Sequence, residues 1–213
     1  VAGFESSPDG SLTTLAGSPF ATVTGSSPLE GIAGLAFTPD GTRAVAGYSS
    51  EGGVQGFSVS TAGALAPVGS PLVSDPGEGL AVTPDGRFVY LASFGGAGGI
   101  RGFAIAADGS LSSLGSGFGG DRFGDVAITP DGRHLFAGDS TTREIARFAI
   151  GADGSLALLG SVPVPVKEPR KLAVSPDGRF LFVAVTNEST ESGVASYAIG
   201  SDGSLQEVGE PAL

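Results

Sequence analysis

Residues 172–208 read LAVSPDGRFLFVAVTNESTESGVASYAIGSDGSLQEV and contain two Asp-Gly pairs, Asp177-Gly178 and Asp202-Gly203. Each pair lies between short runs rich in Val, Ile, Leu and Phe. This is the pattern of a β-hairpin, because glycine adopts a positive φ and aspartate bonds to the nearby backbone. The stretch therefore predicts four consecutive strands at Leu172–Ser175, Phe180–Val185, Val194–Ile199 and Leu205–Val208.

The same stretch recurs along the chain with a fixed period. The glycines of its first turn are spaced by 45, 46 and 46 residues, at Gly41, Gly86, Gly132 and Gly178. The glycines of its second turn each follow an aromatic residue by six positions, at Gly10, Gly63, Gly109, Gly154 and Gly203. No helical periodicity accompanies them. A period near 45 residues with four strands is typical of one blade of a β-propeller.

The first strand of each repeat is apolar on both faces, with a small residue between large ones at Ala36, Ala81, Ala127 and Ala173. Strands that are buried on both sides have this pattern. A single blade cannot bury both of its faces, so neighbouring blades must cover them. A β-sandwich is the alternative all-β fold, and the fixed period argues against it.

We therefore predict an all-β chain, a β-propeller of four-stranded antiparallel blades with four complete blades and one half blade. The predicted units are a half blade at 1–20 and blades at 31–72, 77–118, 122–162 and 169–213. The half blade leaves the strand count short of a multiple of four, and open blade faces favour aggregation. We expect further strands to complete the ring, from either side of the sequence or from a second chain.

Composition excludes several classes of function. The chain has 22 acidic and 11 basic residues and a net charge of −11, which argues against nucleic acid or anionic lipid as a partner. It has no run of eighteen apolar residues, so we expect no membrane insertion. With no Cys and one His it has no thiol chemistry and no His–Cys metal cluster. We expect no cofactor and no metal. We read the sequence as a processed or excised piece of a soluble protein that is secreted or extracytoplasmic.

One end of the predicted ring varies in loop length. The turn between the third and fourth strands has a constant length, whereas the connections at the other end vary. Variable loops on a rigid scaffold usually carry function. The predicted functional face therefore consists of the loops at 20–32, 49–53, 73–79, 94–99, 118–125, 139–144, 163–171 and 186–193.

The segment SPDGRFLFVAV followed by GVASYAIGSDGSL resembles the YVTN-type repeats of lactonase-like β-propellers, a group with 6-phosphogluconolactonases and carboxymuconate cycloisomerases. These enzymes often have Pro-Arg-His before a first strand and Asn-Glu after the next strand. Here Pro169 and Arg170 match, and Lys171 stands in place of His. Asn187 and Glu188 match in type but lie two residues late.

The resemblance implies roles for residues near this motif. Arg170 is expected to bind a carboxylate or phosphate with help from Lys171, and Glu188 to act as the catalytic acid or base. Other substrate-binding candidates are acidic residues of the loop face, at Glu78, Asp125 and Asp139. The single histidine, His134, lies beside a turn at the opposite end of the blade, so we expect a structural role for it.

Two functions remain open at this point. The first is a non-catalytic binding or surface-interaction scaffold that takes a small anionic ligand or a protein partner on the loop face. The absence of a loop-face His and the shifted Glu188 favour this interpretation. The second is a hydrolase or cycloisomerase that acts on a small anionic lactone. The fold alone does not choose between them.

Overall fold

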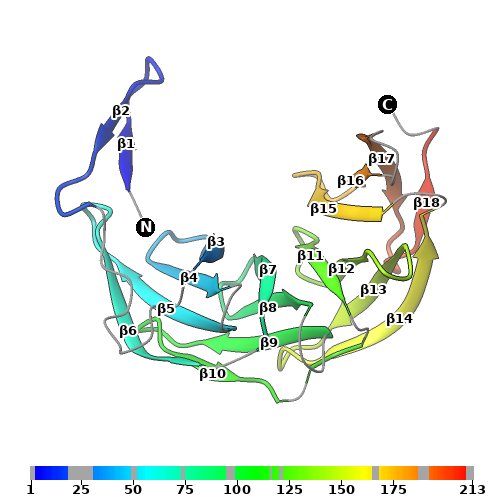
Figure 1. Ribbon diagram of the computed structural model, residues 1–213, viewed down its shortest axis with the longest axis horizontal. Helices are drawn as coiled ribbons and strands as arrows, with labels where there is room; N and C mark the ends of the chain where they lie inside the picture. The colour runs from blue at the N-terminus through cyan, green and yellow to red at the C-terminus, as the bar shows by residue number, and fades with distance from the viewer. Residues whose placement is uncertain are drawn as a thin grey trace.

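The computed structural model describes residues 3–18, 31–48, 52–72, 75–94, 99–115, 117–119, 122–164, 168–186 and 192–209. Every regular element in these ranges is a β-strand, and no helix occurs in them. Four sheets of four antiparallel strands and one two-stranded sheet follow one another in an open arc (Figure 1). The predicted propeller with four complete blades and one half blade is therefore confirmed.

The blades are numbered here in chain order. The half blade consists of β1 (Phe4–Ser6) and β2 (Leu12–Thr14). Blade 1 consists of β3 (Ile32–Phe37), β4 (Arg43–Tyr48), β5 (Gly53–Val59) and β6 (Leu65–Leu72). Blade 2 consists of β7 (Gly77–Val82), β8 (Phe88–Ser93), β9 (Gly99–Ile105) and β10 (Leu111–Ser113). Blade 3 consists of β11 (Phe123–Ile128), β12 (His134–Asp139), β13 (Glu144–Ile150) and β14 (Leu156–Pro163). Blade 4 consists of β15 (Glu168–Val174), β16 (Phe180–Thr186), β17 (Ser192–Ile199) and β18 (Leu205–Glu207).

The first strand of each blade lies on the inner side of the arc, and the fourth lies on the outer side (Figure 1). The inner strands β3, β7, β11 and β15 are neighbours along the arc. Gly34 marks one such contact, because a methyl group there would lie 2.6 Å from the carbonyl oxygen of Glu78 in the next blade. Each inner strand is also an edge strand of its own sheet, so part of its backbone faces the axis of the arc.

The hydrophobic core lies between blades. One cluster joins Tyr90 and Ala92 of blade 2 to Leu135 and Phe148 of blade 3. One face of blade 4 is more exposed than the same face of blade 3. Phe182 of blade 4 is 40% exposed, whereas the residue at the same position of blade 3, Phe136, is 0% exposed. The apolar faces that the repeat predicts are thus buried wherever another described blade covers them.

The turn between the first and second strands of each blade has the same hydrogen bonds. In blade 4 the hydroxyl of Ser175 donates to Asp177 (2.5 Å), and Asp177 accepts the Arg179 N–H (3.1 Å). The N–H of Gly178 donates to the Ser175 carbonyl at 2.8 Å, with Gly178 at a φ of 73°. In blades 1 to 3 the hydroxyl of a threonine donates in the same way to the carboxylate of Asp40, Asp85 or Asp131. The Asp-Gly pairs thus close the hairpins by the interactions that the sequence predicts.

Hydrogen bonds join neighbouring blades at this turn end. Each one runs from a side chain of one blade to a backbone carbonyl in the third-to-fourth-strand turn of the next. Arg43 donates to Ala106 (3.2 Å), the Tyr90 hydroxyl donates to Gly154 (2.8 Å), and Arg147 donates to Gly203 (3.1 Å). Polar contacts therefore set how adjacent blades are aligned, while apolar packing holds them together.

Replacement of Tyr90 by Phe should destabilise the protein, because it leaves the Gly154 carbonyl without its donor. A lost buried partner costs about 1–3 kcal/mol, so we expect a fall in Tm of several degrees. The matched controls are Tyr48→Phe and Tyr197→Phe, since the hydroxyls of both residues are buried without a hydrogen-bond partner. These two variants should be as stable as the wild type. Equal losses of Tm in all three variants would contradict the role of the Tyr90 hydrogen bond.

Acid should weaken the turns. The Ser175 hydroxyl and the Arg179 N–H lower the pKa of Asp177 below its ordinary value, so its contribution to stability is complete above the unfolded-state pKa of about 3.9. That contribution disappears as the pH falls through the lower folded-state pKa. The free energy of unfolding in urea should therefore decline below about pH 4, and less steeply in Asp177→Asn. Parallel pH profiles of variant and wild type would show that Asp177 does not contribute.

Candidate functional site

The inner strands share an irregularity at the loop end of the arc. The pairing of each inner strand with the second strand shifts register near its start, within residues 32–34, 77–80, 123–125 and 169–171. In each blade, one residue within the shift lies eight positions before the glycine of the first turn. These four equivalent residues are Ala33, Glu78, Gly124 and Arg170. A β-bulge inserts a residue and redirects its side chain. We call these four residues the rim row.

The rim row combines opposite charges with a gap. Glu78 and Arg170 are both exposed, and Gly124 lies between them in the order of the blades. Among the residues that the structure describes, a methyl group at Gly124 would meet only the Arg170 carbonyl oxygen, at 3.8 Å, so none of them fills the space in front of this position. The row therefore has a carboxylate in blade 2, a gap in blade 3 and a guanidinium in blade 4.

Arg170 is held by two neighbours and still reaches solvent. One guanidinium nitrogen, Nη2, lies 2.6 Å from the carboxylate of Glu168, and Nε donates to the hydroxyl of Thr186 at 3.1 Å. The side chain nevertheless remains 55% exposed. These contacts restrict the guanidinium without burying it, so an anion from solvent can approach it.

Lys171 and Asp125 form a second pair, which crosses from blade 4 to blade 3. The Lys171 ammonium lies 3.8 Å from Oδ1 of Asp125, and the Leu172 N–H donates to Oδ2 of Asp125 at 2.8 Å. The Lys171 side chain is 58% exposed and that of Asp125 is 12% exposed. Burial raises the pKa of Asp125, and the Leu172 N–H and the Lys171 charge oppose this shift. Asp125 thus ties the two blades together beside Arg170.

The other predicted site residues lie elsewhere. The buried carboxylate of Asp139 accepts the backbone N–H groups of Thr141 (2.7 Å) and Thr142 (3.0 Å) and so closes the turn from β12 to β13. Substrate contact by Asp139 stays a prediction. Glu188, the predicted catalytic residue, lies outside the described residues. The structure thus brings Arg170, Lys171 and Asp125 together, with Glu78 in the same rim row.

The sequence reasoning missed Gly124 and Thr186. Thr186 anchors Arg170, and no motif pointed to it. Gly124 was detectable, because alignment of the four repeats on their turn glycines puts it at the position of Glu78 and Arg170. A glycine at a position where other blades have longer side chains indicates either a tight contact or an open space, and the structure shows that no described residue fills the space at Gly124.

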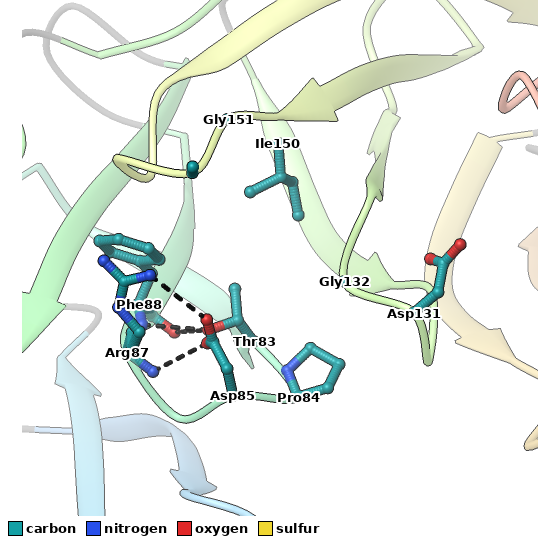
Figure 2. A pocket seen from close by; sticks show the side chains of 10 residues that line it. Thr83, Pro84, Asp85, Arg87, Phe88, Asp131, Gly132, Ile150 and Gly151 are labelled. Carbon is teal, nitrogen blue, oxygen red and sulfur yellow. Dashed lines mark hydrogen bonds and ion pairs between the residues drawn. The ribbon is translucent and has the colours of Figure 1, made fainter.

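Two surface hollows lie between neighbouring blades at the turn end of the arc, away from the rim row. One of about 470 Å³ is lined by residues of blades 2 and 3 (Figure 2). Arg87 at its wall pairs with Asp85 and lies 4.9 Å from the ring centre of Phe88. A hollow of about 500 Å³ has the equivalent lining between blades 3 and 4 and includes His134. Because the hollow recurs from blade to blade, it follows from the repeat and does not single out a site.

Two further findings concern metals and membranes. Across the described ranges, His, Asp and Glu side chains do not gather in groups of three that a metal ion needs. The described part of the chain also contains no helix that is long and apolar enough to cross a membrane.

Comparison with known proteins agrees with this architecture. Residues 111–212 match the family model "Lactonase, 7-bladed beta-propeller". A proposed 6-phosphogluconolactonase from Bacteroides fragilis is similar in structure, with a TM-score of 0.76, 22% identity and coverage of 99% of this chain and 64% of that one. The periplasmic gluconolactonase PpgL of Pseudomonas aeruginosa has a TM-score of 0.75 and 20% identity, with coverage of 99% and 63%.

A Lactobacillus plantarum protein has a TM-score of 0.71 and 19% identity over 85% of this chain and 57% of its own. This chain therefore spans about three fifths of these three solved chains, and at such identities the likeness concerns the fold. No curated protein sequence matches it. The family match over residues 111–212 and the shared fold confirm the resemblance that the repeats predict: this chain has a β-propeller fold and resembles the lactonase-like propellers.

Proposed function

We propose that this protein is a hydrolase that opens a small anionic lactone, and that it binds this substrate at the rim row. The observation that carries this proposal is the pair of exposed cations, Arg170 and Lys171, next to the gap at Gly124. The chain as a whole has a net charge of −11 and repels anions. Each of these cations has a carboxylate partner, Glu168 or Asp125, but more than half of each cationic side chain is exposed, so an anion from solvent can reach both of them.

The two cations suit different parts of an anionic group. The guanidinium of Arg170 can donate two parallel hydrogen bonds to a carboxylate or phosphate, while the ammonium of Lys171 acts as a point charge. Glu168 occupies one side of the guanidinium. An exposed ion pair of this kind contributes about 0–1 kcal/mol, so an incoming anion competes with Glu168 at little cost.

Lactone hydrolysis then needs a base. A water molecule attacks the lactone carbonyl carbon, a carboxylate accepts the proton of that water, and the ring C–O bond breaks as the ring oxygen takes up the proton from the resulting carboxylic acid. Two carboxylates are candidates for this base. The family resemblance indicates Glu188, and the rim row indicates Glu78, which has the equivalent position in blade 2 to that of Arg170 in blade 4.

The names of similar proteins support a sugar lactone as substrate class. One neighbour is a proposed 6-phosphogluconolactonase and another is a gluconolactonase from the periplasm. Both differ from this chain at more than three quarters of the aligned positions, so the substrate and an exported location are proposals for this chain. A phosphorylated lactone would fit the two cations better than a neutral one.

A non-catalytic scaffold is the competing function. The replacement of the motif histidine by Lys171 supports it, because an ammonium group does not act as a general base at neutral pH as readily as an imidazole does. The two functions differ in turnover, since a scaffold binds an anion without hydrolysing it.

The proposed function is tested by hydrolysis of 6-phosphogluconolactone and glucono-δ-lactone, assayed with the full-length protein. We expect acceleration over spontaneous hydrolysis and a lower KM for the phosphorylated lactone. Binding without acceleration would support the scaffold and reject the hydrolase.

Arg170→Ala should raise KM for the anionic lactone by about tenfold to a hundredfold. A charge-assisted hydrogen bond of this kind contributes roughly 1.5–3 kcal/mol to binding. The matched control is Arg87→Ala, because Arg87 is similarly exposed and ion-paired but lies at the turn end of the arc. That variant should keep the wild-type KM. An unchanged KM in Arg170→Ala would remove Arg170 from the site.

The identity of the base is tested with Glu78→Gln and Glu188→Gln. Loss of a general base lowers kcat by about 10²–10⁴-fold while leaving anion binding in place. We expect this loss in one of the two variants and near-normal kcat in the other. If both retain wild-type kcat, neither carboxylate is the base.

A further inference from the structure

We propose that Asp125 is a positioning residue, which holds the cationic pair of blade 4 in place without touching the bound anion. This inference rests on the proposed anion site at the rim row. It changes the role expected for Asp125 from the sequence, where its place on the loop face suggested direct contact with substrate.

The cross-blade contact of Asp125 has no equivalent in the other described blades. Seven positions before the turn glycine, the four blades have Gly34, Gly79, Asp125 and Lys171. The first two have no side chain and cannot reach the next blade. At Gly79 a methyl group would collide with Asp125 itself, so blade 2 leaves room for this carboxylate. Asp125 is therefore wedged between Gly79 of blade 2 and Leu172 of blade 4.

The hydrogen bond of Asp125 fixes the backbone next to Arg170. Arg170 is the irregular residue of β15, where pairing with β16 shifts between Pro169 and Lys171. A bulged strand has fewer ladder hydrogen bonds at that point. The bond from the Leu172 N–H to Asp125, at 2.8 Å, supplies an anchor two residues beyond Arg170. The other carboxylate oxygen lies 3.8 Å from the ammonium of Lys171.

Charge alone does not explain an aspartate here. A buried carboxylate beside Lys171 lowers the positive potential that an anionic ligand meets. If Asp125 acted only through its charge, removal of that charge would strengthen anion binding. If it acts by holding the backbone, removal of the hydrogen-bond acceptor weakens binding in spite of the gain in potential. The two roles thus predict opposite changes in anion affinity when Asp125 is replaced.

The experiment separates acceptor from charge with two variants of the full-length protein. Asp125→Asn keeps an oxygen that accepts the Leu172 N–H and loses the charge, whereas Asp125→Ala loses both. We expect Asp125→Ala to weaken binding of inorganic phosphate by about tenfold, measured by calorimetry, and to raise KM for the lactone similarly. Asp125→Asn should stay within about threefold of wild type in both measurements.

Tyr90→Phe is the control for stability, because it removes a different cross-blade hydrogen bond at the turn end of the arc. It should bind phosphate as the wild type does. Equal weakening in Asp125→Ala and Tyr90→Phe, or tighter binding in Asp125→Ala, would overturn the positioning role. The same holds if the wild type binds no phosphate.

The two proposals fail separately. If the wild type hydrolyses no lactone but the phosphate titrations show the expected order of variants, the positioning role stands and the hydrolase is rejected. If lactone is hydrolysed and Asp125→Ala keeps the wild-type KM and phosphate affinity, the hydrolase stands and the positioning role is rejected.

Discussion

The structure depends on the burial of two apolar faces per blade. Each four-stranded sheet is too thin to form a core of its own, so its side chains pack against the sheets before and after it. Leu135 and Phe148 of blade 3, for example, share a cluster with Tyr90 of blade 2. This constraint makes neighbouring blades stack face to face along an arc. Phe182 shows the converse, because it is exposed where no described blade covers it.

The candidate site is a consequence of the same stacking. The inner strands are edge strands, and their first residues are irregularly paired, so the rim has backbone and side chains that the sheets do not use. Different residues at one repeat position then produce a local chemistry. Arg170 supplies a cation, Glu78 a carboxylate and Gly124 a space, all at the equivalent position of neighbouring blades. A repeat protein thus acquires an asymmetric site by variation at one place in a constant frame.

The sequence motif that contains Arg170 and Lys171 predicted part of the candidate site but not all of it. Proximity of Arg170 and Lys171 is evident from their adjacency in the sequence, and their placement on an inner strand follows from the repeat. The residues that contact these two cations cannot be inferred from the repeat. Glu168 and Thr186 hold the guanidinium, and Asp125, 47 residues away from Leu172, anchors the backbone. The turn that the Asp139 carboxylate closes was likewise not evident from the sequence, and the ligand contact predicted for this residue stays a prediction.

The sequence by itself determined the blade, because hairpin formation depends on local signals: Asp-Gly turns such as Asp177-Gly178, flanked by apolar runs at a fixed period. It also determined that the blades stack, because apolar residues occur on both faces of the first strand. Only the tertiary structure decided which side chains meet across blades, such as Asp125 with Lys171 and Tyr90 with Gly154. The physical reason is that such contacts depend on the relative rotation and register of separate sheets, and no local backbone preference encodes these quantities.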